Sequence, residues 1–137
     1  MIYLTRKFDF CASHRLYKEG LSDEENMRIF GKCSNPNGHG HNYILYVTVC
    51  GEVDPTSGFV IDFTELKDIV ESEIISKVDH KNLNLDVDFM RGILPSAENI
   101  AVQFWKILEP VLKGPKRKLY SIKLEETVNN TVLYKGE

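Results

Sequence analysis

Two kinds of hydrophobic periodicity divide this chain, and their order limits its fold more than any other feature. Apolar and polar side chains alternate over residues 2–12, 39–52, 120–127 and 131–135, as they do in half-buried strands. Two stretches between residues 62 and 114 instead carry apolar side chains at helical spacing. Strands at both ends with consecutive helices between them predict an α+β domain, a four-stranded antiparallel sheet with two helices packed on one face.

Each predicted helix has its own start signal. Asp62 is a good N-cap residue, and Glu65 follows three positions later, as in a capping box. Ser96 is the N-cap candidate of the second helix, and Gly114 ends that helix. The boundaries of the helical layer are therefore well marked in the sequence.

Turn residues mark the remaining connections. Residues 15–38 are rich in Gly, Pro, Asn and charged side chains, and we expect them to form a long irregular loop of a kind that is often functional in small domains. Residues 53–58 form a predicted turn. Residues 59–61 are expected to return from it as a strand and complete a hairpin.

The composition narrows the class of protein. The 137 residues suit one domain, residues 1–137, and the net charge of −3 argues against a broad nucleic-acid surface. No apolar run is long enough to span a membrane, and the first residues lack the pattern of a secretion signal. Three cysteines at irregular positions suit a reducing compartment better than a disulfide framework. We therefore expect a soluble, cytoplasmic protein without nucleic-acid or membrane partners.

Three histidines form the strongest candidate site. His39 and His41 are two residues apart at the start of a predicted strand, so both imidazoles point to one face. His14, just past the end of the first predicted strand, is a candidate third ligand, and three histidines with an open fourth position are typical of catalytic zinc. A turn with solvated histidines explains the pair alone equally well. The addition of His14 favours the metal.

Cys33 is a candidate base in the predicted loop, six residues before His39 and next to Lys32. A nearby cation or metal ion would lower the pKa of its thiol and make the thiolate available for proton removal. The local sequence by itself fits a spare loop thiol better. Cys11 and Cys50 lie inside predicted strands and are interpreted as small hydrophobic residues.

Three acidic or basic side chains outside the loop could also take part in chemistry. Asp79 directly precedes His80, so its carboxylate could fix the imidazole tautomer, although a surface or capping histidine is more common at a helix end. Glu126 shares the predicted face of Ile122 and Leu124, where an ionised carboxylate needs a partner. Because Glu126 is near the end of its strand, it could also simply reach water.

Segments along nearly the whole chain resemble the 6-pyruvoyl-tetrahydropterin synthase family. In order they are FCASHRLY, LSDEEN, FGKCSNPNGHGHNY, GEVDPTSG, VDHKNLN, AENIAVQFW and EETVNNTVLYKGE. The resemblance implies a T-fold subunit and a homohexamer, built as two stacked trimers with active sites between subunits.

The same resemblance assigns roles by position. The family's zinc ligands match His14, His39 and His41, its catalytic base matches Cys33, its proton-transfer partners match Asp79 and His80, and its pterin-binding residues match Glu126 and Ser96. It implies one Zn²⁺ in each subunit and Mg²⁺ as a further requirement for activity, for which the sequence offers no dedicated site. A carboxylate such as Glu126 can bind the ring N–H and the exocyclic amine of a pterin together.

The implied reaction converts 7,8-dihydroneopterin triphosphate to 6-pyruvoyl-tetrahydropterin with elimination of triphosphate, a step of tetrahydrobiopterin biosynthesis. The five residues between Cys33 and His39 match this branch of the family. The segments GFVIDFTELK and PSAEN instead resemble the 6-carboxy-tetrahydropterin synthase of the queuosine pathway, which is the alternative. A non-catalytic pterin-binding T-fold protein ranks third, because Cys33 and the zinc-site histidines are all present.

Overall fold

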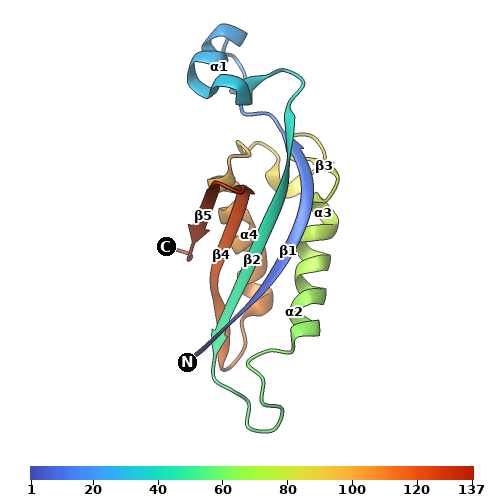
Figure 1. The fold of residues 1–137 in the computed structure, drawn as a ribbon, viewed down its shortest axis with the longest axis vertical. Helices are drawn as coiled ribbons and strands as arrows, with labels where there is room; N and C mark the ends of the chain where they lie inside the picture. The colour runs from blue at the N-terminus through green and yellow to red at the C-terminus, as the bar shows by residue number, and fades with distance from the viewer.

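One sheet of five strands forms the framework of the protein (Figure 1). In this computed structural model, which describes residues 1–137, the strands are β1 (Ile2–His14), β2 (His39–Gly51), β3 (Lys81–Asn82), β4 (Arg117–Thr127) and β5 (Asn130–Tyr134). Their order across the sheet is β3-β1-β2-β4-β5, and the four strands other than β3 pair antiparallel, as the sequence predicts. The prediction of only four strands is wrong. The fifth strand, β3, pairs in parallel with Ala12 and Ser13 and is too short to show a periodicity.

β1 and β2 pair along their whole lengths. Ile2 lies opposite Gly51 at one end, and His14 lies opposite His39 at the other. This register follows from the alternation, because a shift by one residue would turn the apolar side chains of β1 away from the core. It also places two of the candidate histidines side by side.

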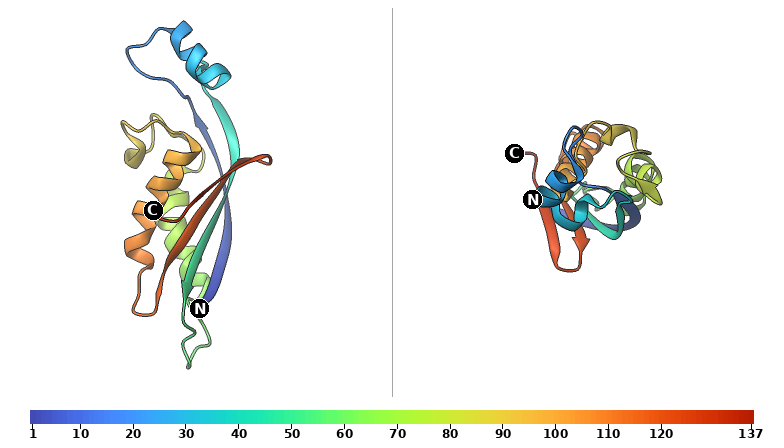
Figure 2. Two further views of the ribbon diagram at one scale, coloured as in Figure 1. Left: turned by 90° about the vertical axis from the view of Figure 1, so that its left-hand side faces the viewer. Right: turned by 90° about the horizontal axis from the view of Figure 1, so that it is seen from above.

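The helical layer covers one face of the sheet (Figure 2). Its helices are α2 (Phe63–Val70), α3 (Ser76–Val78) and α4 (Ala97–Leu112), with a π-helical segment at Glu71–Ile75. The chain also forms α1 (Asp23–Phe30) and short 3-10 turns at Gly31–Ser34 and Asp88–Met90. α2, the π-helical segment and α3 follow one another without a break and form one rod beside α4. The prediction of two helices on one face is confirmed. None of the helices combines the length and the apolar character needed to cross a membrane.

Both predicted N-caps are confirmed. The Asp62 carboxylate accepts a hydrogen bond from a first-turn amide at 2.6 Å, and the Ser96 hydroxyl accepts one from the Asn99 amide at 3.2 Å. These bonds satisfy backbone N–H groups that have no partner within the helix. The predicted capping box is wrong, because the Glu65 carboxylate pairs instead with Arg117 at 2.7 Å.

The hydrophobic core fills the space between the sheet and the helical layer. Phe10 of β1 stacks on Tyr43 of β2 with ring centroids 4.8 Å apart, and it meets the edge of Phe104 from α4. Tyr43 and Phe104 are fully buried. The three candidate histidines continue the same face of β1 and β2 beyond these rings. The candidate site therefore lies at one end of the core.

Residues 15–38 are not wholly irregular, in contrast to the prediction. They contain α1, which stands beyond the end of the sheet (Figure 1) and which Ser22 caps by accepting a hydrogen bond from the Glu25 amide at 3.1 Å. Asn26 of α1 is buried and bonds to both backbone groups of Lys18, at 2.9 and 3.3 Å. These polar contacts hold α1 within its own loop.

The hairpin predicted at residues 59–61 is wrong. The Asp54 amide donates to the Phe59 carbonyl at 2.9 Å, and the Asp54 carboxylate accepts hydrogen bonds from the Thr56 and Ser57 amides at 2.9 and 2.8 Å. The loop after β2 thus closes on itself. The backbone groups of Asp54 and Phe59 bond to each other within the loop. No strand follows the loop before α2.

Candidate metal centre and adjoining cleft

Three histidine side chains meet at the end of the β1–β2 pair. Nε2 of His14 and Nε2 of His39 lie 3.1 Å apart, and the candidate ligand nitrogens of His14, His39 and His41 all lie within 4.8 Å of one another. Strand alternation places His39 and His41 on one side of β2, and the register places His14 opposite His39. The convergence expected from the sequence is present.

His14 is the most enclosed of the three. It is 1% exposed, and its Nδ1 donates a hydrogen bond to the Pro95 carbonyl at 2.8 Å. A carbonyl oxygen can only accept, so Nδ1 carries the proton and Nε2 presents a free lone pair. Burial lowers the pKa of His14 and keeps the ring neutral at neutral pH.

The other two histidines have ring nitrogens without a protein partner. His39 Nδ1 and His41 Nε2 are both buried and form no hydrogen bond. Burial lowers the pKa of His41, an effect that the negative charge of Glu126 opposes. Zinc binds neutral imidazoles, and two ligands at 2.0–2.1 Å from a tetrahedral ion lie roughly 3.3 Å apart. The three imidazoles, and the 3.1 Å spacing of the His14 and His39 nitrogens, therefore fit Zn²⁺.

Glu126 stands between the histidines and a cleft. Its carboxylate Oε1 lies 3.8 Å from His41 Nε2. The cleft has a volume of about 450 Å³, and its lining includes Glu126, Ser96, Leu16, Asn129 of the β4–β5 turn and residues 130–132 of β5. Because Glu125 lies opposite Ile44 of β2, strand alternation puts Glu126 on the core face with Leu124, as the sequence predicts. The structure thus brings together Glu126 and Ser96, the two residues that match pterin-binding positions in the family resemblance.

Cys33 belongs to the surroundings of the histidine cluster. It is partly buried, and its carbonyl accepts a hydrogen bond from the Leu16 amide at 2.8 Å, two residues after His14. The Tyr43 hydroxyl, 3.5 Å from His14 Nδ1, has a pKa that is raised by burial and further by its proximity to Glu126 and Cys33. The hydrogen bond between Leu16 and Cys33 ties the 3-10 turn after α1 to the segment that follows His14.

Asp79 and His80 form a pair at the outer edge of β1. The Asp79 carboxylate contacts His80 Nδ1 at 3.0 Å and accepts a hydrogen bond from the Cys11 amide at 2.9 Å, which lowers the pKa of Asp79. His80 has a positive φ of 61°, and its side chain is 80% exposed. The pair has the orientation expected from the sequence. No hydrogen bond or ion pair links it to the three clustered histidines within the same chain.

The cysteines outside the site differ in environment. Cys50 is buried, as expected of a small hydrophobic residue. Cys11 is exposed, so the same interpretation is wrong for it. What Cys11 contributes is its backbone, which anchors Asp79 to the edge of β1.

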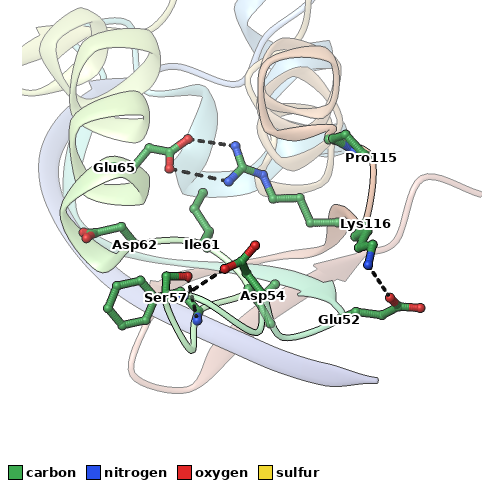
Figure 3. A pocket seen from close by; sticks show the side chains of 12 residues that line it. Glu52, Asp54, Ser57, Ile61, Asp62, Glu65, Pro115 and Lys116 are labelled. Atoms are coloured by element: carbon green, nitrogen blue, oxygen red, sulfur yellow. Dashed lines mark hydrogen bonds and ion pairs between the residues drawn. The ribbon is translucent and has the colours of Figure 1, made fainter.

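A second cleft, of about 470 Å³, opens at the opposite end of β2 (Figure 3). Its charged side chains are engaged in structural contacts. Glu65 pairs with Arg117 at 2.7 Å, and the carboxylate of Asp54 accepts hydrogen bonds from its own loop, which lower its pKa. Lys116 pairs with Glu52 at 3.5 Å. These contacts hold the loop after β2 against the turn before β4, and none of the candidate residues lies there.

The fold and the histidine cluster define an α+β protein with a candidate metal centre next to a ligand-sized cleft. Residues 3–137 match the family described as 6-pyruvoyl tetrahydropterin synthase, and the chain belongs to this family. The family expected from the resemblance is therefore confirmed.

Individual relatives agree with this assignment. The 6-pyruvoyl tetrahydrobiopterin synthase of Homo sapiens is 51% identical over 134 residues, which cover 98% of this chain and 91% of that protein. The structure of Caenorhabditis elegans 6-pyruvoyl tetrahydropterin synthase matches with a TM-score of 0.90 at 45% identity, over 99% of this chain and 96% of that chain. A 6-carboxy-5,6,7,8-tetrahydropterin synthase of Rickettsia typhi is 31% identical over 147 residues, covering 94% of this chain and 96% of that protein.

Proposed function

We propose that this chain is a zinc-dependent lyase that converts 7,8-dihydroneopterin triphosphate to 6-pyruvoyl-tetrahydropterin with elimination of triphosphate. The convergence of His14, His39 and His41 beside the cleft of Glu126 carries the proposal. It offers a metal centre and an acidic anchor at adjoining positions, as a reaction on the side chain of a bound pterin requires. The relatives named 6-pyruvoyl tetrahydrobiopterin synthase support the same product.

The histidine cluster prepares the chain for the metal. Bound zinc would polarise the hydroxyl groups of the substrate side chain and acidify the adjacent C–H bonds. Burial keeps His14 and His41 neutral, so their nitrogens are available as ligands without loss of a proton. Mg²⁺, which the family resemblance also implies, would bind to the triphosphate oxygens of the substrate.

Glu126 and Ser96 would orient the pterin ring. The Glu126 carboxylate can accept hydrogen bonds from a ring N–H and the exocyclic amine together, in the bidentate manner that carboxylates show with Arg. Ser96 lines the same cleft. Its hydroxyl can donate to the ring while its oxygen accepts the capping bond of α4. The substrate side chain would then extend toward His41.

Cys33 and His80 would move the protons. The Cys33 thiolate removes a proton from a side-chain carbon, and His80, oriented by Asp79, transfers a second one. The electrons released when one side-chain carbinol becomes a ketone reduce the pterin ring. The loss of triphosphate converts the neighbouring carbinol to the second ketone, so the reaction needs no external redox cofactor.

The exposure of His80 supports a site that a second copy of the chain completes. The Asp79–His80 pair is solvent-exposed at the edge of β1, where it can face a neighbouring subunit. The sheet has two free edges, one along β5 and one along β1, of which β3 covers only Ala12 and Ser13. β1 and β5 run antiparallel, so copies can extend the sheet through these edges. On this basis we propose a T-fold subunit in a homohexamer of two trimers.

The main alternative is a 6-carboxy-tetrahydropterin synthase, which would use the same site. The 31% identity to such a protein in Rickettsia typhi is well below the 51% identity to the human 6-pyruvoyl enzyme, and this difference favours the pyruvoyl product. A non-catalytic pterin-binding protein is disfavoured because Cys33 and the three clustered histidines are all present.

Product analysis by mass spectrometry tests the proposal. Zinc-loaded protein is incubated anaerobically with 7,8-dihydroneopterin triphosphate and Mg²⁺. We expect 6-pyruvoyl-tetrahydropterin and an equal amount of triphosphate. A 6-carboxy product with acetaldehyde would move the protein to the alternative, and no product despite bound zinc would indicate a pterin binder.

A further inference from the structure

One side chain holds the turn that precedes α4. The Leu94 carbonyl accepts two hydrogen bonds at 2.9 Å, one from the Ser96 amide and one from Nδ2 of Asn99. The Asn99 backbone amide donates to the Ser96 hydroxyl at 3.2 Å. Asn99 thus binds the residues on both sides of Pro95. The turn over residues 94–96 consequently has little freedom to move.

Pro95, in the middle of this turn, contacts the candidate metal centre. It is buried, and its carbonyl accepts the Nδ1 proton of His14 at 2.8 Å. The Tyr43 hydroxyl lies farther away, at 3.5 Å, and cannot donate to a nitrogen that already carries a proton. The Pro95 carbonyl is therefore the contact that decides which ring nitrogen of His14 is protonated.

We propose that Asn99 is a positioning residue of the metal centre. It acts through the turn at residues 94–96, which holds the Pro95 carbonyl against His14 Nδ1 and leaves Nε2 free to bind the ion. The same turn includes Ser96, which lines the cleft next to Glu126. One turn would therefore position both a metal-binding histidine and a pterin-binding residue. The inference rests on the proposed metal site and adds a residue that is not itself a ligand.

Asn99→Asp is the variant that isolates this role. It keeps the size of the side chain but replaces the Nδ2 donor with an oxygen that repels the Leu94 carbonyl, while a carboxylate in the first turn of a helix favours α4 itself. Gln103→Glu is the matched control, because it makes the same amide-to-acid change one turn further along α4. Asn99→Ala is a second variant that removes the donor without adding charge.

Nitrogen NMR of the histidine rings tests the proposal in the metal-free protein. In the wild type and in Gln103→Glu, we expect His14 as the Nδ1–H tautomer. In Asn99→Asp and Asn99→Ala, the His14 signals should move toward the Nε2–H form, while circular dichroism shows the helix content of the wild type. An unchanged Nδ1–H tautomer in both Asn99 variants would overturn the proposal.

Competition with a chromophoric zinc chelator gives a second readout. The Asn99 variants should bind zinc about tenfold more weakly than the wild type and Gln103→Glu, at the lower end of the effect expected for residues that support metal ligands. Equal zinc affinities in folded variants would also overturn the proposal. If the wild type does not bind zinc, the proposed metal site is wrong. The tautomer measurement does not need zinc, so it still tests whether Asn99 positions the Pro95 carbonyl.

Discussion

Nε2 of His14 and Nε2 of His39 lie 3.1 Å apart across the last residue pair that joins β1 to β2. Two ligands of one tetrahedral zinc ion are separated by roughly 3.3 Å. The register of two long strands therefore brings these nitrogens to the spacing that the ion requires. Ligands on paired strands keep their positions better than ligands on loops, so little ordering is needed when the ion binds.

Loss of one clustered histidine should abolish metal binding. In His39→Ala the zinc affinity is expected to fall by more than about 100-fold, beyond the range for residues that only support ligands. Elemental analysis after dialysis against a weak chelator measures the bound zinc. His80→Ala is the matched control, because His80 is the fourth of four histidines and lies outside the cluster. Equal zinc loss in both variants would contradict the assignment of the ligands.

Cys33→Ala should separate the chemistry from metal binding. Zinc content and secondary structure should stay unchanged, because Cys33 is not one of the three clustered ligands. The kcat for triphosphate release should fall by about 100-fold or more, as expected for the loss of a general base. Cys11→Ala serves as the control, since its side chain is exposed and only its backbone holds Asp79. Unchanged turnover in Cys33→Ala would exclude Cys33 as the base.

Glu126→Gln should weaken pterin binding. The amide cannot accept both hydrogen bonds from the ring, and losing a charge-assisted bond costs about 1.5–3 kcal/mol, a rise of roughly 10- to 150-fold in Kd. Fluorescence titration with a pterin measures this change. Glu125→Gln is the neighbouring control, because the Glu125 carboxylate accepts from the Tyr46 hydroxyl at 3.2 Å and does not line the cleft. A comparable loss of affinity in both variants would argue against Glu126 as the anchor.

Gly38→Ala should distort the metal centre through the backbone. Gly38 has a φ of 72°, and an added Cβ would lie 2.9 Å from the His14 carbonyl oxygen. Gly58 has a similar φ of 80°, but a Cβ there meets no atom within 4 Å. Gly58→Ala should therefore cost only the backbone strain, about 1–2 kcal/mol of unfolding free energy. Gly38→Ala should cost more and also lower the zinc affinity. Urea unfolding and chelator competition on both variants check this difference.

The metal-free protein should lose stability as the solution is acidified from neutral pH. Burial lowers the pKa of His14 and His41 in the folded chain, whereas unperturbed histidine titrates at 6.5. The unfolded state then binds more protons than the folded state, so the free energy of unfolding falls with falling pH, by at most about 1.4 kcal/mol per pH unit for each group. Urea unfolding at several pH values measures the slope. His14→Asn should show a shallower slope, and equal slopes would contradict a buried neutral His14.

The framework could be predicted because its signals are local. Two-residue alternation identified the antiparallel strands, and the polar residues Asp62 and Ser96 marked the starts of the covering helices correctly. α1 is not among the predicted helices, although Ser22 followed by Glu25 is a capping signal. Its apolar residues Met27 and Ile29 are exposed, so it shows no buried stripe. β3 depends on contacts with β1 that no pattern in two residues can encode.

The clustering of the three histidines could be predicted, but the contacts that support the cluster could not. Alternation and strand register suffice to bring His14 to His39 and His41. The contact between His14 and the Pro95 carbonyl involves a backbone atom from a distant segment, and no side-chain pattern predicts it. The cleft beside Glu126 is lined by three segments that are distant in the sequence, and no local pattern shows that they meet. The roles inferred for the catalytic and pterin-binding residues remain predictions.

The pairing of His14 with His39 closes the loop formed by residues 15–38. A zinc ion bound to both would act as a reversible cross-link at the mouth of this loop, and it would restrict the open chain much as a disulfide does. The last hydrogen bonds between β1 and β2 would then fray less, and their amide hydrogens would exchange more slowly. Because the same loop carries Cys33, occupancy of the metal site would also set how freely the proposed base can move.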